Sequence, residues 1–223
     1  MRIGKTENLA KALGVFSLIY MGLFFQRTRW EGGQLLFGWV NLLLQVWLDL
    51  VAIGCARKIG SRLFGIAFLF AAFTDLVYGL KLQVFGITHD MGTPLEWLVN
   101  GPYLLFQVFS LAALAKSNPK KSISAGVAVI LFIGVLVGMG PSVMAKPWPF
   151  QTKFIHFACF MFESGLFGFG LGRGKIGIGF LIIASYGLLL QSMEIYSGLE
   201  VGLPIEFLWT SALLFIVSGL SRE

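Results

Sequence analysis

Long apolar runs separated by short polar segments make up the pattern of this chain. A helix that crosses a membrane needs about 20 consecutive, mostly apolar residues. The runs are rich in Leu, Phe and Gly and lack the strict alternation of membrane barrel strands, so they predict helices. Eight runs meet this requirement, at residues 10–26, 34–56, 63–84, 95–115, 122–143, 154–172, 176–196 and 204–221.

The composition indicates that the solvent around these helices is lipid. Of the 223 residues, 57% are hydrophobic and 13% are charged, and the mean hydropathy is +0.81. A soluble chain carries about a quarter charged residues and could not bury this much apolar surface. We therefore expect an all-α, polytopic membrane helix bundle with eight transmembrane helices. The first run lacks a small-residue cleavage site, which favours a retained anchor over a signal peptide.

The basic residues predict the orientation of the bundle, because cytoplasmic loops of membrane proteins are enriched in Lys and Arg. With the N-terminus cytoplasmic, 12 of the 17 Lys and Arg residues lie on the inner side, and both termini are cytoplasmic. The expected location is a bacterial cytoplasmic membrane, or the endoplasmic reticulum in a eukaryote. The net charge of +6 is then a topology signal, and no nucleic-acid partner is expected. The inner set is Arg2, Lys5, Lys11, Arg57, Lys58, Arg62, Lys116, Lys120, Lys121, Arg173, Lys175 and Arg222.

The two halves of the chain share motifs that predict an internal repeat. Gly-rich basic segments at 54–60 and 170–177 precede the third and seventh runs, and Pro-x-Glu-aromatic motifs at 94–97 and 204–207 open the fourth and eighth. Four spans per unit is an even number, so the units would share one orientation. Chance likeness between apolar helices and simple helix capping are the alternative explanations. The predicted units are residues 1–116 and 117–223.

Ionisable and amide side chains inside the spans are the candidate functional groups, because they are costly in lipid and face a bundle interior or cavity. Residues spaced by three or four lie on one helix face, and several polar sets have this spacing. We expect these stripes to converge on one polar cavity. The predicted catalytic acids are Asp49, Asp75 and Glu163, and the predicted substrate-binding residues are Asn41, Gln45, Tyr78, Glu96, Asn100, Tyr103, His156 and Gln191.

A carboxyl kept protonated in such a cavity is a proton donor for a substrate dissolved in the bilayer. The alternative is a structural role, in which Asp75 pairs with Lys81 and Glu163 with His156 as links between helices. His156 and Glu163 are seven residues apart, wider than the close pairs of metal-binding helices. We therefore expect neither a metal nor another cofactor. The many aromatic rings pack the bundle or stabilise a carbocation.

Motifs in the first four spans follow a recognisable order. Tyr20 precedes Arg27-Thr28, Asn41 precedes Trp47-Leu48-Asp49, and these are followed by Asp75 with Tyr78 and Lys81 and by Asn100-Gly101-Pro102. In this order the chain resembles the small integral membrane terpene cyclases of meroterpenoid pathways. The resemblance implies a metal-independent cyclase that protonates a hydrophobic, prenyl-type substrate. Asp49 would be the proton donor, and Glu163 and Asp75 would assist.

The likeness has one clear gap, because the acid in the family's final helix has no counterpart in residues 215–219. Glu163 or Glu206 would have to replace it. The paired Pro-x-Glu motifs are also similar to those of the small membrane lycopene cyclases, with Trp97 and Phe207 in place of a second acid.

Two other classes of protein are compatible with the same features. A small transporter, channel subunit or membrane sensor would use the acids to bind a cation or relay protons. A scaffold subunit would use its Gly-rich helix faces to dock other membrane proteins. In every case the lipid bilayer is a partner, and the sequence does not define the oligomeric state.

Overall fold

The computed structural model describes residues 33–86, 92–118, 120–197 and 206–222, and the regular structure in these ranges is helical. The seven helices there confirm that the predicted runs from the second to the eighth are helical. The first predicted run, 10–26, lies outside the described residues. The helices are α2 (Gly33–Lys58), α3 (Arg62–Gln83), α4 (Pro94–Ser117), α5 (Lys121–Ala145), α6 (Phe150–Gly170), α7 (Gly174–Ser197) and α8 (Glu206–Leu220).

Five of these helices are long and apolar enough to cross a membrane: α2, α3, α4, α5 and α7. The apolar part of α8, Leu208–Leu220, is shorter, and α6 carries the polar residues His156 and Glu163 within its 21 residues. The described part of the chain thus has the architecture of a multi-pass, integral membrane protein.

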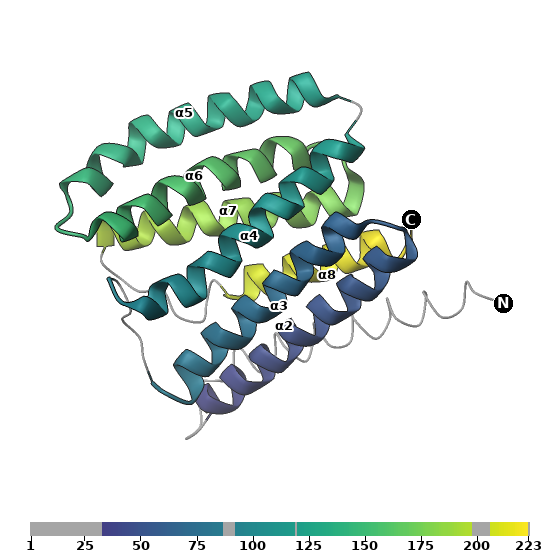
Figure 1. The fold of residues 1–223 in the computed structure, drawn as a ribbon, viewed down its shortest axis with the longest axis horizontal. Coiled ribbons are helices and arrows are strands. Elements are labelled where there is room, and N and C mark those ends of the chain that lie inside the picture. The colour runs from purple at the N-terminus through teal and green to yellow at the C-terminus, as the bar shows by residue number, and fades with distance from the viewer. Residues whose placement is uncertain (1–32, 87–91, 119, 198–205, 223) are drawn as a thin grey trace.

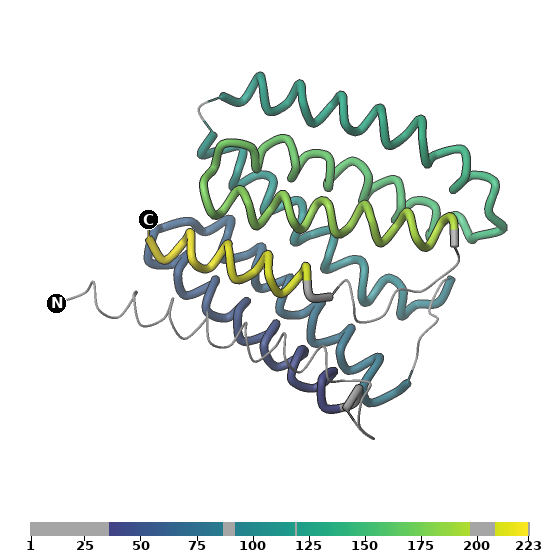
Figure 2. Tube along the Cα trace, turned by 180° about the vertical axis from the view of Figure 1, so that it is seen from behind, coloured from purple at the N-terminus to yellow at the C-terminus, as the bar shows by residue number. Residues whose placement is uncertain are grey.

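Six helices form a closed ring of neighbours. Around the ring α2 packs on α3, α3 on α4, α4 on α6, α6 on α7, α7 on α8, and α8 on α2. Helix α5 lies outside the ring at one edge of the bundle, against α6, as the views from both sides show (Figures 1 and 2). The contact between α2 and α8 closes the ring and brings segments from opposite ends of the sequence together.

The distribution of polarity is opposite to that of a soluble protein. Helix α5 has the highest mean hydropathy of the five spans, 2.4, yet only 17% of that span is buried. Its Ile130 and Val137 are 74% and 70% exposed, whereas Asp49 and Gln107 are completely buried. Large apolar side chains on the outside and polar ones on the inside are the arrangement expected for a bundle surrounded by lipid.

Aromatic side chains fill the centre of the ring. Phe64 of α3 stacks on Phe180 of α7, and Phe106 of α4 packs against both Phe68 of α3 and Phe180, with ring centroids 5.8 to 6.3 Å apart. Trp209 of α8 meets Phe106 edge-on at 5.6 Å. Such pairs contribute about 0.5–1.5 kcal/mol each beyond the area that they bury. The polar side chains described next are held against this aromatic core.

Candidate functional site

The predicted stripe on α2 faces the interior and meets α8. Asn41, Gln45 and Asp49 are 4%, 6% and 0% exposed. The Thr210 hydroxyl donates to Asn41 Oδ1 over 3.2 Å, and Gln45 Nε2 donates to Thr210 Oγ1 over 3.2 Å. A single hydroxyl therefore satisfies two amide side chains of the stripe and joins the two helices that close the ring.

Two carboxyls lie side by side between α2 and α3. The Asp75 carboxyl is close enough to interact with that of Asp49, and its Oδ2 accepts a hydrogen bond from Trp209 Nε1 over 3.0 Å. The hydrogen-bond partner of Asp75 in the structure is thus Trp209, where the structural alternative named Lys81. Two carboxylates at such close range in an apolar interior repel each other, so the pair is expected to hold a shared proton.

Asp49 differs from the other interior acids in its lack of hydrogen bonds. Its side chain is completely buried, and neither carboxyl oxygen has a hydrogen-bond partner among the residues that the structure describes. The group that interacts with it most closely is the neighbouring Asp75 carboxyl, itself an acceptor when ionised. A buried polar group without a partner costs about 1–3 kcal/mol, so this carboxyl is the strongest candidate for direct contact with a substrate or ion.

Glu163 of α6 is held in the opposite way, by three neutral donors. Its Oε1 accepts from the Tyr103 hydroxyl over 3.4 Å and from Gln107 Nε2 over 3.3 Å, and its Oε2 accepts from Gln191 Nε2 over 2.6 Å. The donors come from α4 and α7, so this one carboxyl connects three helices of the ring. Its geometry is that of an anchored acceptor.

The space beside Glu163 exists because residue 187 of α7 is glycine. A Cβ on Gly187 would overlap the Glu163 carboxyl, with Oε1 as the nearest atom. The glycine therefore lets α7 approach the acid closely. A similar close approach holds α5 on α6, where a Cβ on Gly168 would lie 2.5 Å from the backbone oxygen of Ser124.

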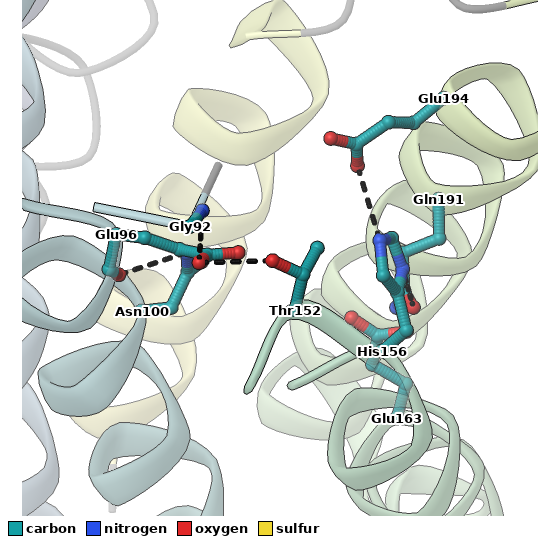
Figure 3. Close-up of polar contacts among 8 residues, drawn as sticks. All are labelled: Gly92, Glu96, Asn100, Thr152, His156, Glu163, Gln191 and Glu194. Carbon is teal, nitrogen blue, oxygen red and sulfur yellow. Dashed lines mark hydrogen bonds and ion pairs between the residues drawn. The ribbon is translucent and has the colours of Figure 1, made fainter. Parts of the chain in front are cut away.

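A series of polar contacts extends from Glu163 toward the end of α7 (Figure 3). Gln191, which donates to Glu163, has its Oε1 3.2 Å from His156 Nδ1. His156 Nε2 lies 3.8 Å from Glu194 Oε2, and the Glu194 side chain is 27% exposed. The Trp148 ring stacks on the His156 ring with centroids 4.8 Å apart. Gln191 thus stands between the predicted partners Glu163 and His156, and the series reaches the bundle surface.

Glu96 and Asn100 occupy a separate place at the beginning of α4 (Figure 3). Glu96 Oε2 accepts from Gly92 N over 2.8 Å, from Gln151 Nε2 over 3.2 Å and from Thr152 Oγ1 over 3.0 Å, and Asn100 Nδ2 donates to the Glu96 backbone oxygen. These bonds tie the first turn of α4 to the first turn of α6. The geometry supports a capping role for Glu96.

Trp209 and Tyr103 join the two acid centres through their rings. Trp209 donates to Asp75, Tyr103 donates to Glu163, and the two ring centroids are 5.8 Å apart. The predicted stripes of α2, α3, α4, α6 and α7 therefore contribute to one connected interior. Tyr78 is placed differently, since its ring lies 5.7 Å from Lys81 Nζ.

Sequence reasoning did not single out Trp209 and Thr210, although both bond to predicted site residues. They lie in a run that is otherwise apolar, so no polar stripe marks them. The proposed repeat contained a usable signal, because matching the two Pro-x-Glu motifs places Thr210 opposite Asn100. No sequence pattern marks Gly187 as a site residue, because its role depends on how closely α6 approaches it.

The described residues hold no group of three or more His, Cys, Asp or Glu side chains arranged for a metal ion. The interior instead offers single carboxyls, amides and hydroxyls. Comparison of the chain with models of known protein families, with curated proteins and with solved structures finds no match.

The contact between Asp75 and Trp209 predicts an energetic coupling between α3 and α8. In a double-mutant cycle, Trp209→Phe and Asp75→Leu should each destabilise the protein. The double variant should lose less unfolding free energy than the two single variants together, by a coupling energy of about 0.5–3 kcal/mol. The reason is that the second substitution removes a group that has already lost its hydrogen-bond partner. Unfolding in detergent measures the four stabilities. The control cycle combines Asp75→Leu with Trp97→Phe, because the Trp97 ring packs on Phe154. Additive losses of stability in both cycles would contradict the hydrogen bond between Asp75 and Trp209.

Proposed function

We propose that this protein is a membrane-bound isoprenoid cyclase that uses an intramembrane carboxylic acid as proton donor. The observation that carries the proposal is the Asp49 carboxyl, which is completely buried, without a hydrogen-bond partner among the described residues, and next to a second carboxyl. Such an acid has its proton available for a substrate. The resemblance to membrane terpene cyclases supports the same chemistry.

The surroundings of Asp49 suit a proton donor. Trp209 Nε1 donates to Asp75, which favours the ionised form of Asp75 and leaves the shared proton on Asp49. The Asp49 O–H bond then breaks as a substrate alkene takes the proton and forms a C–H bond. A second alkene of the same substrate molecule attacks the resulting carbocation and closes a ring. Loss of a neighbouring C–H proton to a carboxylate of the pair completes the reaction and restores the acid.

Aromatic rings near the acid pair suit the cationic intermediate. Trp209 lies between the acid pair and the rings of Tyr103 and Phe106, at centroid distances of 5.8 and 5.6 Å. Ring faces attract cations by about 0.5–2 kcal/mol each, most strongly where water is absent. Glu163, anchored by three donors, positions Tyr103 in this proposal and does not donate the proton.

Replacing the donor tests this proposal. Asp49→Asn should lower the rate of cyclisation about 100-fold or more, the usual contribution of a general acid, whereas Asp49→Glu should keep part of it. The assay incubates purified protein in lipid with linear prenyl alcohols, their epoxides and prenylated aromatics, and detects cyclic products by mass spectrometry. Glu223→Gln is the matched carboxyl-to-amide control. Equal rates for Asp49→Asn and the unchanged protein, at equal amounts of folded protein, would reject Asp49 as the donor.

A small cation or proton transporter is the second candidate, and a specific observation favours it. The contacts from Glu194 through His156 and Gln191 reach Glu163 from the surface of the bundle. Beside Glu163, Gln107 Oε1 is buried and has no hydrogen-bond partner among the residues that the structure describes. Carboxylate, amide and hydroxyl oxygens are the ligands that hard cations prefer, and intramembrane acids commonly mark ion pathways.

Transport predicts movement of ions without any chemical change in a lipid. Proteoliposomes carrying a proton or sodium gradient should dissipate it faster than protein-free liposomes, and Glu163→Gln should slow this flux at least tenfold. The readout is a pH-sensitive or sodium-sensitive dye inside the vesicles, with Glu223→Gln again as the control. Flux equal to that of empty liposomes for every gradient would reject this candidate.

We also propose the finer architecture of eight spans in two four-helix units, residues 1–116 and 117–223, with both termini cytoplasmic. The neighbour relationships support it, because α2 packs on α8 in the same way that the matching helix α6 packs on α4. The polar pairs support it too. Asp75 of α3 faces Asp49 of α2, and Gln191, which aligns with Asp75 in the repeat, bonds to Glu163 of α6.

A further inference from the structure

A recess of about 870 Å³ lies at the basic end of the bundle, away from the interior acids. It is formed where α4 ends, α5 begins and α6 turns into α7. Its lining consists of small polar and basic side chains, namely Lys116, Ser117, Asn118, Lys121, Ser122 and Arg173.

The charge of this recess is strongly positive. Lys116, Lys121 and Arg173 contribute three cations, and none of the six described lining residues is acidic. Helix α5, 25 residues long, begins at Lys121, so its free N–H groups and the positive end of its dipole are at the same place. Both features favour an anion.

Hydrogen bonds hold the walls of the recess in place. Arg173 donates from Nη1 to the Ser117 backbone oxygen and from Nη2 to Ser117 Oγ, each over 2.6 Å. Asn118 Nδ2 donates to Ser124 Oγ over 2.8 Å, and Asn118 Oδ1 accepts from Lys120 N over 2.8 Å. Arg173 Nε is buried and has no hydrogen-bond partner in the described part of the chain. The bonds to Ser117 therefore hold the guanidinium beside the recess as a fixed positive charge, which attracts phosphate groups.

We propose that this recess binds a phosphate group, and that the group belongs to the headgroup of an anionic phospholipid. Basic pockets between transmembrane helices at the cytoplasmic side commonly hold such headgroups. The surface next to the recess favours a lipid over free phosphate, because Ile123, two residues after Lys121, is 64% exposed and Ile130 is 74% exposed. This apolar face of α5 offers the acyl chains a path that starts at the phosphate.

Lipid-dependent stability of the full-length protein tests the site. Phosphatidylglycerol added to detergent-purified protein should raise its unfolding temperature by about 2–4 °C or more. Phosphatidylcholine, which has no net charge, should leave it unchanged. Inorganic phosphate alone should give a smaller shift, because it lacks the acyl chains. The variant Lys116→Ala/Lys121→Ala should fold and lose the response to phosphatidylglycerol.

The matched control is Lys58→Ala/Arg62→Ala, which removes the same charge from exposed residues that do not line the recess. This control should keep the full response. Equal responses of the two double variants, or no response of the unchanged protein to phosphatidylglycerol or phosphate, would overturn the site. A shift with inorganic phosphate and none with phosphatidylglycerol would overturn the assignment to a lipid.

Discussion

Pairing of polar side chains between helices, in an interior that lipid surrounds, is the constraint on which this structure depends. Lipid supplies no hydrogen bonds, so a polar side chain inside the bundle must find its partner on another helix or bear the cost of having none. Thr210 of α8 satisfies Asn41 and Gln45 of α2, and Glu163 of α6 collects donors from α4 and α7. These contacts lie along the same ring of helices that encloses the aromatic core.

Among the described residues, one interior acid breaks this rule, and it gives the proposed function its location. Asp49 shares the interior with bonded neighbours but has no hydrogen bond among the described residues, next to Asp75, which Trp209 holds. Glu163, on the other side of the Trp209 and Tyr103 rings, is fully engaged. The two acid centres therefore differ in their contacts, and in the proposed cyclase the first donates the proton while the second is an anchored acceptor.

The sequence predicted the helices and the polar faces well, because both depend on local periodicity. Apolar run length located seven helices within a few residues, and the spacing of Asn41, Gln45 and Asp49 predicted one buried stripe. Partners across helices were harder to predict, since they depend on which helices become neighbours. The periodicity of α3 contains no information on whether Asp75 meets Lys81 or Trp209. In the structure Asp75 bonds to Trp209, and Tyr78, on the same helix, lies beside Lys81.

Cross-linking between α2 and α8 measures whether the ring of helices is closed around its polar interior. Thr210 Oγ1 and Asn41 Oδ1 are 3.2 Å apart, so cysteines at positions 41 and 210, in a background with Cys55→Ala and Cys159→Ala, should be joined by a short bifunctional thiol reagent in native membranes. Cysteines at 41 and 137 should not be joined, because α5 lies outside the ring. Failure of the first pair, or equal cross-linking of both, would contradict the closed polar interior.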